Sequence, residues 1–366
     1  MDIFYDKKVS KTYEYIETKN RKLYNENKGG IEMVRVAING FGRIGRLAFR
    51  LMEEDPDFEI VAINDLTDAE QLAYLLKYDT NHRNYRIDEI HSEGDNIVVG
   101  DRSIKIYAET DPTNLPWKDL DIDVVLECTG KFTSEEKAMA HINAGAKKVI
   151  ISAPAKGNIK TIVYNVNHMI LNGDEKIISA ASCTTNCLAP VVDVLDKEFG
   201  IVKGYMTTVH AYTNDQATLD VPHKKGIKAR RGRACAANIV PASTGAASAI
   251  GKVCPNLDGK LDGAAMRVPV PTGSVIDLVL EFEKNTTAEE INAVLKGAQN
   301  ETLQYTDDPI VSSDVIGRHC GSLVDGLSTS VLEVEGKQLA RVVSWYDNEM
   351  SYTAQMVRTA KYLMEQ

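Results

Sequence analysis

The sequence predicts an α/β fold, in which a Rossmann-type domain with a parallel sheet is followed by an α+β domain with a mixed or largely antiparallel sheet. Strand-like and helix-like segments alternate from Val34 to about residue 152, and this alternation is typical of a parallel sheet covered on both faces. A glycine-rich turn separates the first strand from the first helix, and long strand-like segments dominate after residue 183. A chain of 366 residues has room for two or three domains.

In the first half, hydrophobic patterning and turn residues define each element in order. The expected strands cover residues 34–39, 58–64, 121–128 and 148–152, the expected helices cover residues 43–54, 68–77 and 134–144, and a hairpin is expected over residues 97–108.

In the second half, the strand-like segments are longer and the helices are fewer. Strands are expected within residues 204–213, 264–283 and 328–346, and helices near residues 183–198 and 287–298. The final segment, residues 348–366, predicts an amphipathic helix, because Tyr352, Met356, Ala360 and Leu363 fall near one stripe.

Composition excludes several classes of protein. A net charge of −10 argues against a general nucleic-acid binder, and no apolar stretch approaches the length of a membrane span. Residues 1–32 are polar and without an apolar signal-peptide core, so we expect a disordered extension of a cytoplasmic protein. Six unevenly spaced cysteines do not resemble a disulfide framework.

The turn "INGFGRIGR", residues 38–46, carries Gly40, Gly42 and Gly45 between a strand and a helix. Such a turn lets the backbone approach a pyrophosphate, which the helix N-terminus attracts through its free N–H groups. Asp65 ends the second strand, where a carboxylate holds the ribose hydroxyls of NAD and repels the extra phosphate of NADP. The alternative for Asp65 is a cap on the helix that follows.

Two cysteines in "ASCTTNC", residues 181–187, allow four interpretations. A structural zinc site needs four ligands, and no second Cys/His pair has suitable spacing, so no metal is expected. A disulfide across one helical turn fits disulfide geometry poorly. Burial as a small hydrophobic side chain suits Cys187, which lies one turn inside the helix.

Cys183 is the candidate nucleophile. Ser182 is a good N-cap residue, so Cys183 would be the first helical residue, where the helix dipole and free amides lower the pKa of a thiol. The candidate base is His210, in the alternating segment "TTVHAYT".

Seven segments, "INGFGRIGR", "ASCTTNC", "HAYTNDQ", "RRGRA", "PASTGAA", "MRVPVPTGSV" and "WYDNEMSY", follow one another in an order that resembles the phosphorylating glyceraldehyde-3-phosphate dehydrogenases of the bacterial glycolytic type. The resemblance runs from about Val34 to the C-terminus. It implies a homotetramer of two-domain subunits, with an NAD-binding Rossmann domain (residues 33–182 and 348–366) and a catalytic domain (residues 183–347).

The resemblance also implies the reaction, which is oxidation of glyceraldehyde 3-phosphate by NAD with inorganic phosphate to give 1,3-bisphosphoglycerate. Cys183 would form a hemithioacetal and then a thioester, and His210 would serve as base toward the thiol and as acid toward the developing alkoxide. No nucleic acid, membrane or metal takes part in this reaction.

Two residue sets follow from the same resemblance. The residues expected to bind the two phosphates are Ser182, Thr184, Thr213, Arg231, Thr244, Gly245 and Arg267. Arg230 and Arg233 remain alternatives to Arg231, because this stretch departs from the common pattern. Besides the three glycines and Asp65, the residues expected to bind the cofactor are Arg43, Ile44, Thr110, Thr129, Gly130, Ser152 and Asn348. Thr129 and Gly130 could equally form only a turn at the end of a strand.

Two other functions compete with this one. A sister enzyme that oxidises erythrose 4-phosphate would share the fold and the cysteine, although the intact set for inorganic phosphate favours the triose enzyme. A catalytically silent binding protein or adhesin is the other alternative, but Cys183, His210 and Arg267 together argue against it, since binding alone needs no nucleophile with a base.

Overall fold

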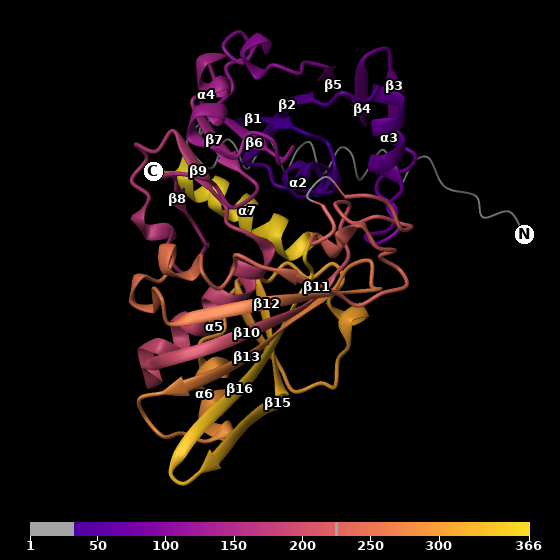
Figure 1. Cartoon of the computed structure of the whole chain (residues 1–366). Coiled ribbons are helices and arrows are strands. Elements are labelled where there is room, and N and C mark those ends of the chain that lie inside the picture. The colour runs from indigo at the N-terminus through magenta and orange to yellow at the C-terminus, as the bar shows by residue number, and fades with distance from the viewer. Residues whose placement is uncertain (1–32, 224–225) are drawn as a thin grey trace, which may run out of the picture.

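The computed structural model describes residues 33–223 and 226–366. They contain two sheets with their helices, the first at the top of Figure 1 and the second below it. The expected extension, residues 1–32, lies outside the described residues. In chain order the helices and strands are β1 (Val34–Asn39), α2 (Arg43–Glu53), β2 (Phe58–Asn64), α3 (Ala69–Lys77), β3 (Ile90–Glu93), β4 (Asn96–Val99), β5 (Arg102–Tyr107), β6 (Val124–Glu127), α4 (Glu135–Asn143), β7 (Lys148–Ile151), β8 (Lys160–Thr161), β9 (Ile177–Ser179), α5 (Cys183–Phe199), β10 (Ile201–Ala211), β11 (Val240–Ser243), β12 (Leu261–Val268), β13 (Ser274–Phe282), α6 (Ala288–Gly297), β14 (Leu303–Thr306), β15 (Ser322–Val334), β16 (Lys337–Tyr346) and α7 (Met350–Met364).

The first sheet has nine strands in the order β3-β4-β5-β2-β1-β6-β7-β9-β8. Every pairing from β5 to β8 is parallel, which confirms the predicted Rossmann-type sheet. The predicted hairpin forms as β4 and β5, and β3 adds a further antiparallel strand at the same edge. The short strands β3, β8 and β9 were not predicted, because two to four residues carry too little alternation to be recognised.

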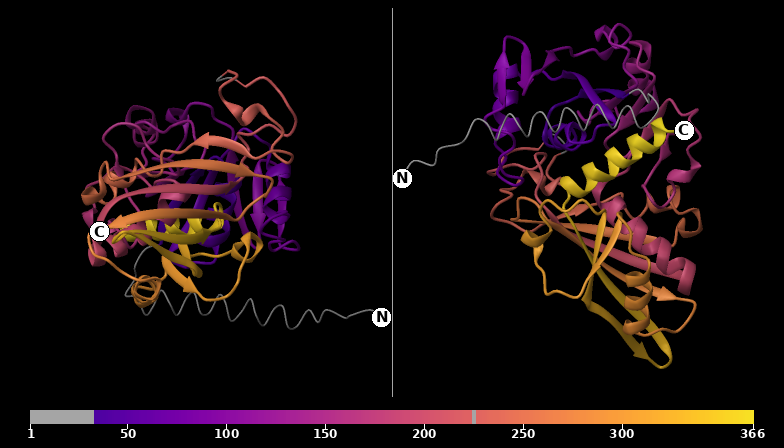
Figure 2. Two further views of the ribbon diagram at one scale, coloured as in Figure 1. Left: turned by 60° about the horizontal axis from the view of Figure 1, so that its bottom comes forward. Right: turned by 180° about the vertical axis from the view of Figure 1, so that it is seen from behind.

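Helices cover both faces of this sheet. On one face α2, α3 and α7 bury side chains such as Phe49, Leu72 and Met356 against β1 and β2. On the other face α4 packs near the fully buried Trp117. The C-terminal helix α7, drawn in yellow, runs across the first sheet beside α2 although it follows the last strand of the second sheet (Figures 1 and 2).

The second sheet has seven strands in the order β11-β12-β10-β13-β16-β15-β14. It is mixed, as predicted, since β10 pairs in parallel with β12 and β14 with β15 while the other pairings are antiparallel. Helices α5 and α6 pack on one face and bury residues such as Leu188, Leu195 and Ile291 against Leu278 and Val342. The parallel register sets His210 of β10 opposite Arg267 of β12.

No helix in the described part of the chain combines the length and the apolar character that crossing a bilayer requires.

The turn between β1 and α2 admits only glycine at two positions. Gly40 has φ +93°, a left-handed conformation, and a Cβ there would lie 2.8 Å from the Thr129 nitrogen. A Cβ at Gly45 would lie 2.2 Å from the Gly40 carbonyl oxygen. Nothing lies within 4 Å of a Cβ at Gly42, so the turn is packed from behind and open in front.

We expect Gly45→Ala to lower the free energy of unfolding of the ligand-free protein by about 3 kcal/mol, because the methyl group must displace the Gly40 carbonyl. Gly42→Ala is the matched control, and its cost should not exceed about 1 kcal/mol, that of a poorer N-cap. Urea unfolding of both variants measures the difference. Equal costs for the two variants would contradict the close packing behind the turn.

Candidate active site

Helix α5 begins at Cys183, as the sequence predicts, because Ser182 caps it. The Ser182 hydroxyl oxygen accepts a hydrogen bond from the Thr185 nitrogen at 3.1 Å. Cys183 is therefore the first helical residue, next to amides that have no partner inside the helix. Cys187 lies one turn further along and is fully buried, which agrees with its interpretation as a small core residue.

The ring of His210 faces the Cys183 thiol. His210 Nε2 lies 3.4 Å from Cys183 Sγ, and Nδ1 lies 2.7 Å from the carbonyl oxygen of Ala211. In the tautomer with its proton on Nδ1, that carbonyl accepts the N–H and the Nε2 lone pair is directed at the thiol. The ring is buried, and the ring of Tyr346 packs edge-on against it at 5.9 Å. The arrangement suits removal of the thiol proton by a neutral imidazole.

Burial opposes the separate ionisation of either group. It raises the pKa of the Cys183 thiol, and with the positive charge of Arg267 it lowers the pKa of His210 to about 3. The expectation that the helix dipole and the free amides lower the thiol pKa is therefore wrong, because burial outweighs them and raises the pKa of Cys183. Proton transfer from Sγ to Nε2 creates no net charge, and at 3.4 Å each ion stabilises the other. The cysteine is thus activated by its partner rather than by exposure to water.

Arg267 lies on the other side of His210. Its Nη1 donates to the Ala211 carbonyl oxygen at 2.9 Å and to Thr213 Oγ1 at 3.3 Å, and it lies 2.8 Å from His210 Nδ1. Its Nε is buried and has no hydrogen-bond partner within the described residues. A buried guanidinium with an unpartnered N–H suits an anion such as phosphate.

The structure separates the three arginines of the "RRGR" segment. Arg231 forms an ion pair with Asp215, which also accepts a hydrogen bond from Thr213, so Arg231 joins the group around Arg267. Arg233 instead pairs with Asp220 at 3.0 Å. Within residues 33–223 and 226–366, no hydrogen bond or ion pair brings the Arg230 side chain to this group. Of the three alternatives, Arg231 is the one near the candidate phosphate site.

Other members of the expected phosphate set lie differently. The Thr184 side chain is buried, and its hydroxyl lies 2.9 Å from the Tyr346 hydroxyl and 4.0 Å from Cys183 Sγ. Thr244 and Gly245 follow β11, whose last residue, Ser243, pairs with Ala264 rather than with Arg267. In the described part of the chain, no hydrogen bond connects Thr244 or Gly245 to Cys183, His210 or Arg267.

The expected cofactor residues gather at the carboxyl ends of the parallel strands. Gly40 follows β1, Asp65 follows β2, Thr129 follows β6 and Ser152 follows β7, and these strand ends meet at one edge of the sheet. A cavity of about 310 Å³ opens there, and its lining includes Gly40, Gly42, Asp65, Thr110 and Thr129. Open space around a Cβ at Gly42 and at Gly130 lets a ligand approach the backbone closely. These features fit a dinucleotide.

Asp65 is held at the rim of this cavity. Its carboxylate accepts hydrogen bonds from the Phe41 nitrogen at 2.7 Å and from the Thr67 nitrogen at 3.0 Å. It does not cap the next helix, because Asp68 is the N-cap of α3. The remaining lone pairs of Asp65 are those available to a ribose.

The side chains of Arg43 and Ile44, two of the residues expected at the cofactor, make contacts within the protein. The Arg43 guanidinium turns away from the glycine turn to form ion pairs with Asp79 and Glu349. Ile44 packs against the hydrophobic core. The N–H groups at the start of α2 remain directed along the helix axis, where a pyrophosphate would bind.

Asn348 and Ser152 complete the expected set. Asn348 Oδ1 accepts hydrogen bonds from Ser274 Oγ at 2.8 Å and from the Gly273 nitrogen at 3.2 Å, so its amide nitrogen is the group left for a ligand. The Ser152 nitrogen donates to the Glu127 carbonyl oxygen at 2.9 Å, which joins the ends of β6 and β7.

Sequence reasoning missed Glu127, which supports the cofactor edge from behind. Its buried carboxylate accepts hydrogen bonds from Asn39 Nδ2 at 2.5 Å and from the Thr129 nitrogen at 2.8 Å, and lies 3.2 Å from His141 Nε2. Thr129 therefore does form a turn at the strand end, and it also lines the cavity. Nothing local in "VVLECTG" signals that this glutamate is buried. Among the described residues, no group of three His, Cys, Asp or Glu side chains is placed to hold a metal ion.

Comparison with known proteins agrees with this geometry. Two family models match the chain, "Glyceraldehyde 3-phosphate dehydrogenase, NAD binding domain" over residues 34–135 and "Glyceraldehyde 3-phosphate dehydrogenase, C-terminal domain" over residues 182–348. The chain is 60% identical over 330 residues to the glyceraldehyde-3-phosphate dehydrogenase of Clostridium pasteurianum, covering 90% of this chain and 98% of that protein. It is 59% identical to that of Clostridium acetobutylicum and 57% identical to that of Streptococcus pyogenes serotype M1, with the same coverage.

We expect His210→Asn to raise the pH at which iodoacetamide alkylates Cys183. Asparagine cannot accept the thiol proton, so the thiol must ionise alone, and burial raises its pKa. Mass spectrometry of labelled peptides across a pH series gives the rate for Cys183, and the buried Cys187 in the same peptide serves as the unreactive control. An alkylation profile that matches the wild type would remove His210 from this role.

Proposed function

Because the chain belongs to the glyceraldehyde 3-phosphate dehydrogenase family, we propose that it oxidises D-glyceraldehyde 3-phosphate to 1,3-bisphosphoglycerate through a thioester on Cys183. The chain is an NAD-dependent dehydrogenase, and NAD is its cofactor. One observation carries the proposed mechanism, namely that the Cys183 thiol faces Nε2 of a buried histidine beside the guanidinium of Arg267.

The first step is attack of Cys183 on the aldehyde carbon. His210 Nε2 accepts the thiol proton while sulfur forms its bond to carbon, and the resulting imidazolium returns a proton to the carbonyl oxygen, which gives a hemithioacetal. Tyr346 and the Ala211 carbonyl keep the ring in place during both transfers.

Oxidation converts the hemithioacetal to a thioester. A bound NAD would supply the acceptor for the hydride that leaves the substrate carbon. His210 takes the hydroxyl proton at the same time, so that the carbonyl re-forms and the acyl group stays on Cys183. Inorganic phosphate then attacks the thioester carbon, the carbon–sulfur bond breaks, and the acyl phosphate leaves with the thiolate restored. The thioester conserves the oxidation energy that simple hydrolysis would lose.

Charge around His210 links phosphate binding to proton transfer. Burial and the positive charge of Arg267 together lower the pKa of His210. Phosphate bound to Arg267 and Arg231 would offset this positive charge and raise the pKa of the imidazole, which makes it a better base. Ser182 and Thr213 supply hydroxyl groups to the same region, since the Arg267 guanidinium contacts Thr213 and Ser182 precedes Cys183.

The assembly and organisation of the chain are part of the same proposal. Residues 33–182 with residues 348–366 form the cofactor domain, and residues 183–347 form the catalytic domain. Each domain would contain one of the two sheets, and α7 would return to the cofactor domain. Four subunits form a homotetramer, which works in the cytoplasm. Exposed apolar side chains near the arginine segment, such as Leu219, Val221 and Ile239, support a contact between subunits there.

Replacement of the two cysteines tests the mechanism. Cys183→Ser should lower the rate of NADH formation from NAD, phosphate and glyceraldehyde 3-phosphate by at least about a thousandfold, because a serine hydroxyl is a far weaker nucleophile. Cys187→Ser should leave most activity, since Cys187 is a buried core residue whose Sγ lies 3.7 Å from Ser322 Oγ, 3.7 Å from the Ser344 carbonyl oxygen and 4.0 Å from the Trp345 carbonyl oxygen. Equal losses of activity in the two variants would refute the assignment of Cys183 as the nucleophile. If the wild type oxidises erythrose 4-phosphate faster than glyceraldehyde 3-phosphate, erythrose 4-phosphate replaces glyceraldehyde 3-phosphate as the proposed substrate.

Asp65 should impose a preference for NAD over NADP of at least two orders of magnitude in kcat/KM, or about 3 kcal/mol. The extra phosphate of NADP blocks a hydrogen bond to the carboxylate and brings like charges together in a partly desolvated site. Steady-state kinetics with both cofactors measure the ratio, and Asp65→Asn should reduce it. A wild-type ratio near one would show that Asp65 does not contact the ribose.

A further inference from the structure

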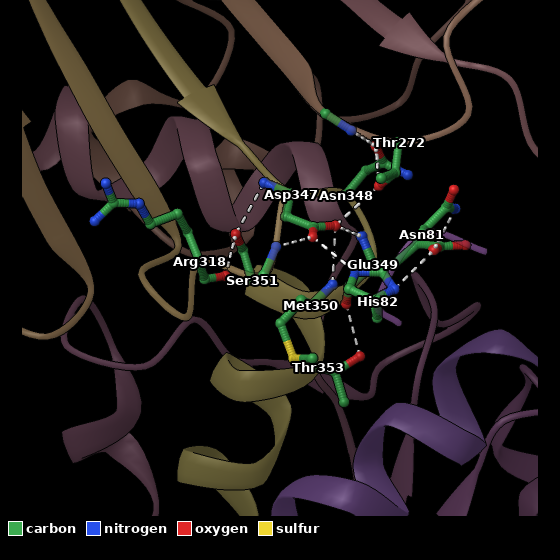
Figure 3. A network of polar contacts seen from close by, with 12 residues as sticks. Asn81, His82, Thr272, Arg318, Asp347, Asn348, Glu349, Met350, Ser351 and Thr353 are labelled. Carbon is green, nitrogen blue, oxygen red and sulfur yellow. Dashed lines mark hydrogen bonds and ion pairs between the residues drawn. The ribbon is translucent and has the colours of Figure 1, made fainter. Parts of the chain in front are cut away.

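A buried ion pair joins the segment after α3 to the segment before α7. His82 Nε2 lies 2.8 Å from Asp347 Oδ2, and the two side chains are 2% and 0% exposed. Figure 3 shows the pair among the polar side chains at the start of α7. His82 belongs to the part of the chain that builds the first sheet, whereas Asp347 directly follows the last strand of the second sheet. The contact therefore connects the two halves of the molecule.

Asp347 is bonded through both carboxylate oxygens. Oδ2 accepts from His82 and from the Gly317 nitrogen at 2.8 Å. Oδ1 accepts from Thr272 Oγ1 at 3.0 Å, from the Glu349 nitrogen at 2.9 Å and from the Met350 nitrogen at 3.0 Å. Asp347 thus fixes the backbone that carries the next residue, Asn348.

The orientation of Asn348 depends on the same neighbours. Thr272 Oγ1, which bonds Asp347, also lies 3.4 Å from Asn348 Oδ1, and Ser274 Oγ donates to that oxygen at 2.8 Å. These donors turn the Asn348 amide nitrogen away from the protein oxygens, and among the described residues this nitrogen has no hydrogen-bond partner. A rotation of Asn348 would therefore accompany any shift of Asp347.

His82 is the charged partner of this group. Three carboxylates, those of Asp79, Asp347 and Glu349, face the ring together with the Arg43 guanidinium. Burial disfavours a charged ring, but hydrogen bonds with Asp347 and Asp79 outweigh it and raise the pKa of His82 to about 9. His82 is thus charged at neutral pH, and its removal leaves Asp347 buried without a cation.

We propose that His82 is a positioning residue for the cofactor, which holds Asp347 and through it directs the Asn348 amide toward the carboxamide of the nicotinamide. This inference rests on the proposed function, since the partner that it gives the Asn348 amide is a bound nicotinamide. It assigns to His82, outside the cavity, a specific effect on one end of the dinucleotide.

Titration calorimetry with NAD and with ADP-ribose, which lacks the nicotinamide, tests the proposal on the purified full chain. His82→Asn, whose amide is too short to reach Asp347 Oδ2, should weaken NAD binding about tenfold and ADP-ribose binding less than about twofold. His82→Gln, which returns a donor near the position of Nε2, should recover most of the affinity for NAD. His168→Gln is the matched control, because His168 packs on Tyr362 away from this group.

Steady-state kinetics should agree, with a raised KM for NAD and an unchanged KM for glyceraldehyde 3-phosphate. Asn348→Ala should show the same selective loss, and adding His82→Asn to it should cost little more. Equal weakening of NAD and ADP-ribose, or no weakening of either, would overturn the proposal. If His82→Asn does not fold, His82→Phe takes its place. If the wild-type protein does not bind NAD, the proposed function itself is refuted.

Discussion

The position of Cys183 depends on a covalent constraint, since only residues 180–182 join strand β9 of the first sheet to helix α5 of the second. The link bends sharply at Ala181, which has φ +61°, a conformation that costs a residue with a side chain about 1 kcal/mol. Hydrogen bonds offset that cost, because Asn186 Nδ2 donates to the carbonyl oxygens of Ala180 and Ser182 at 2.9 and 3.0 Å. Cys183 consequently packs against the hydrophobic cores of both sheets, between the cofactor edge and His210.

Features with a local signal could be predicted from the sequence. Three such features are the glycine turn, the N-cap at Ser182 and the alternating strands, each of which depends on residues within one turn or one strand. The parallel sheet and the start of α5 could therefore be predicted from the sequence. The mixed second sheet also followed, because its strands are long. Short strands such as β8 and β14 did not, since their pairing comes from neighbours distant in sequence.

The exact chemistry of several candidate residues could not be predicted, because their partners lie far away in the chain. The Thr184 hydroxyl is hydrogen-bonded to Tyr346, and the Arg43 guanidinium is hydrogen-bonded to Glu349. The partial burial of Cys183 and the burial of His210, which set the direction of their pKa shifts, are likewise properties of the assembled core. The three arginines of the arginine segment are a simpler case. One ion pair, between Arg231 and Asp215, identifies Arg231 rather than Arg233 as the arginine near the candidate phosphate site.

Helix α7 has a consequence for how the chain folds as it is made. Met356, Ala360 and Leu363 pack into the core of the first sheet, although that sheet is built from residues that leave the ribosome much earlier. The face of the first sheet that α7 covers therefore stays uncovered until translation has ended and the last residues emerge. Until then a nascent chain carries an apolar surface bare, which is the kind of intermediate that chaperones bind. The order of synthesis and the order of core completion are opposite in this protein.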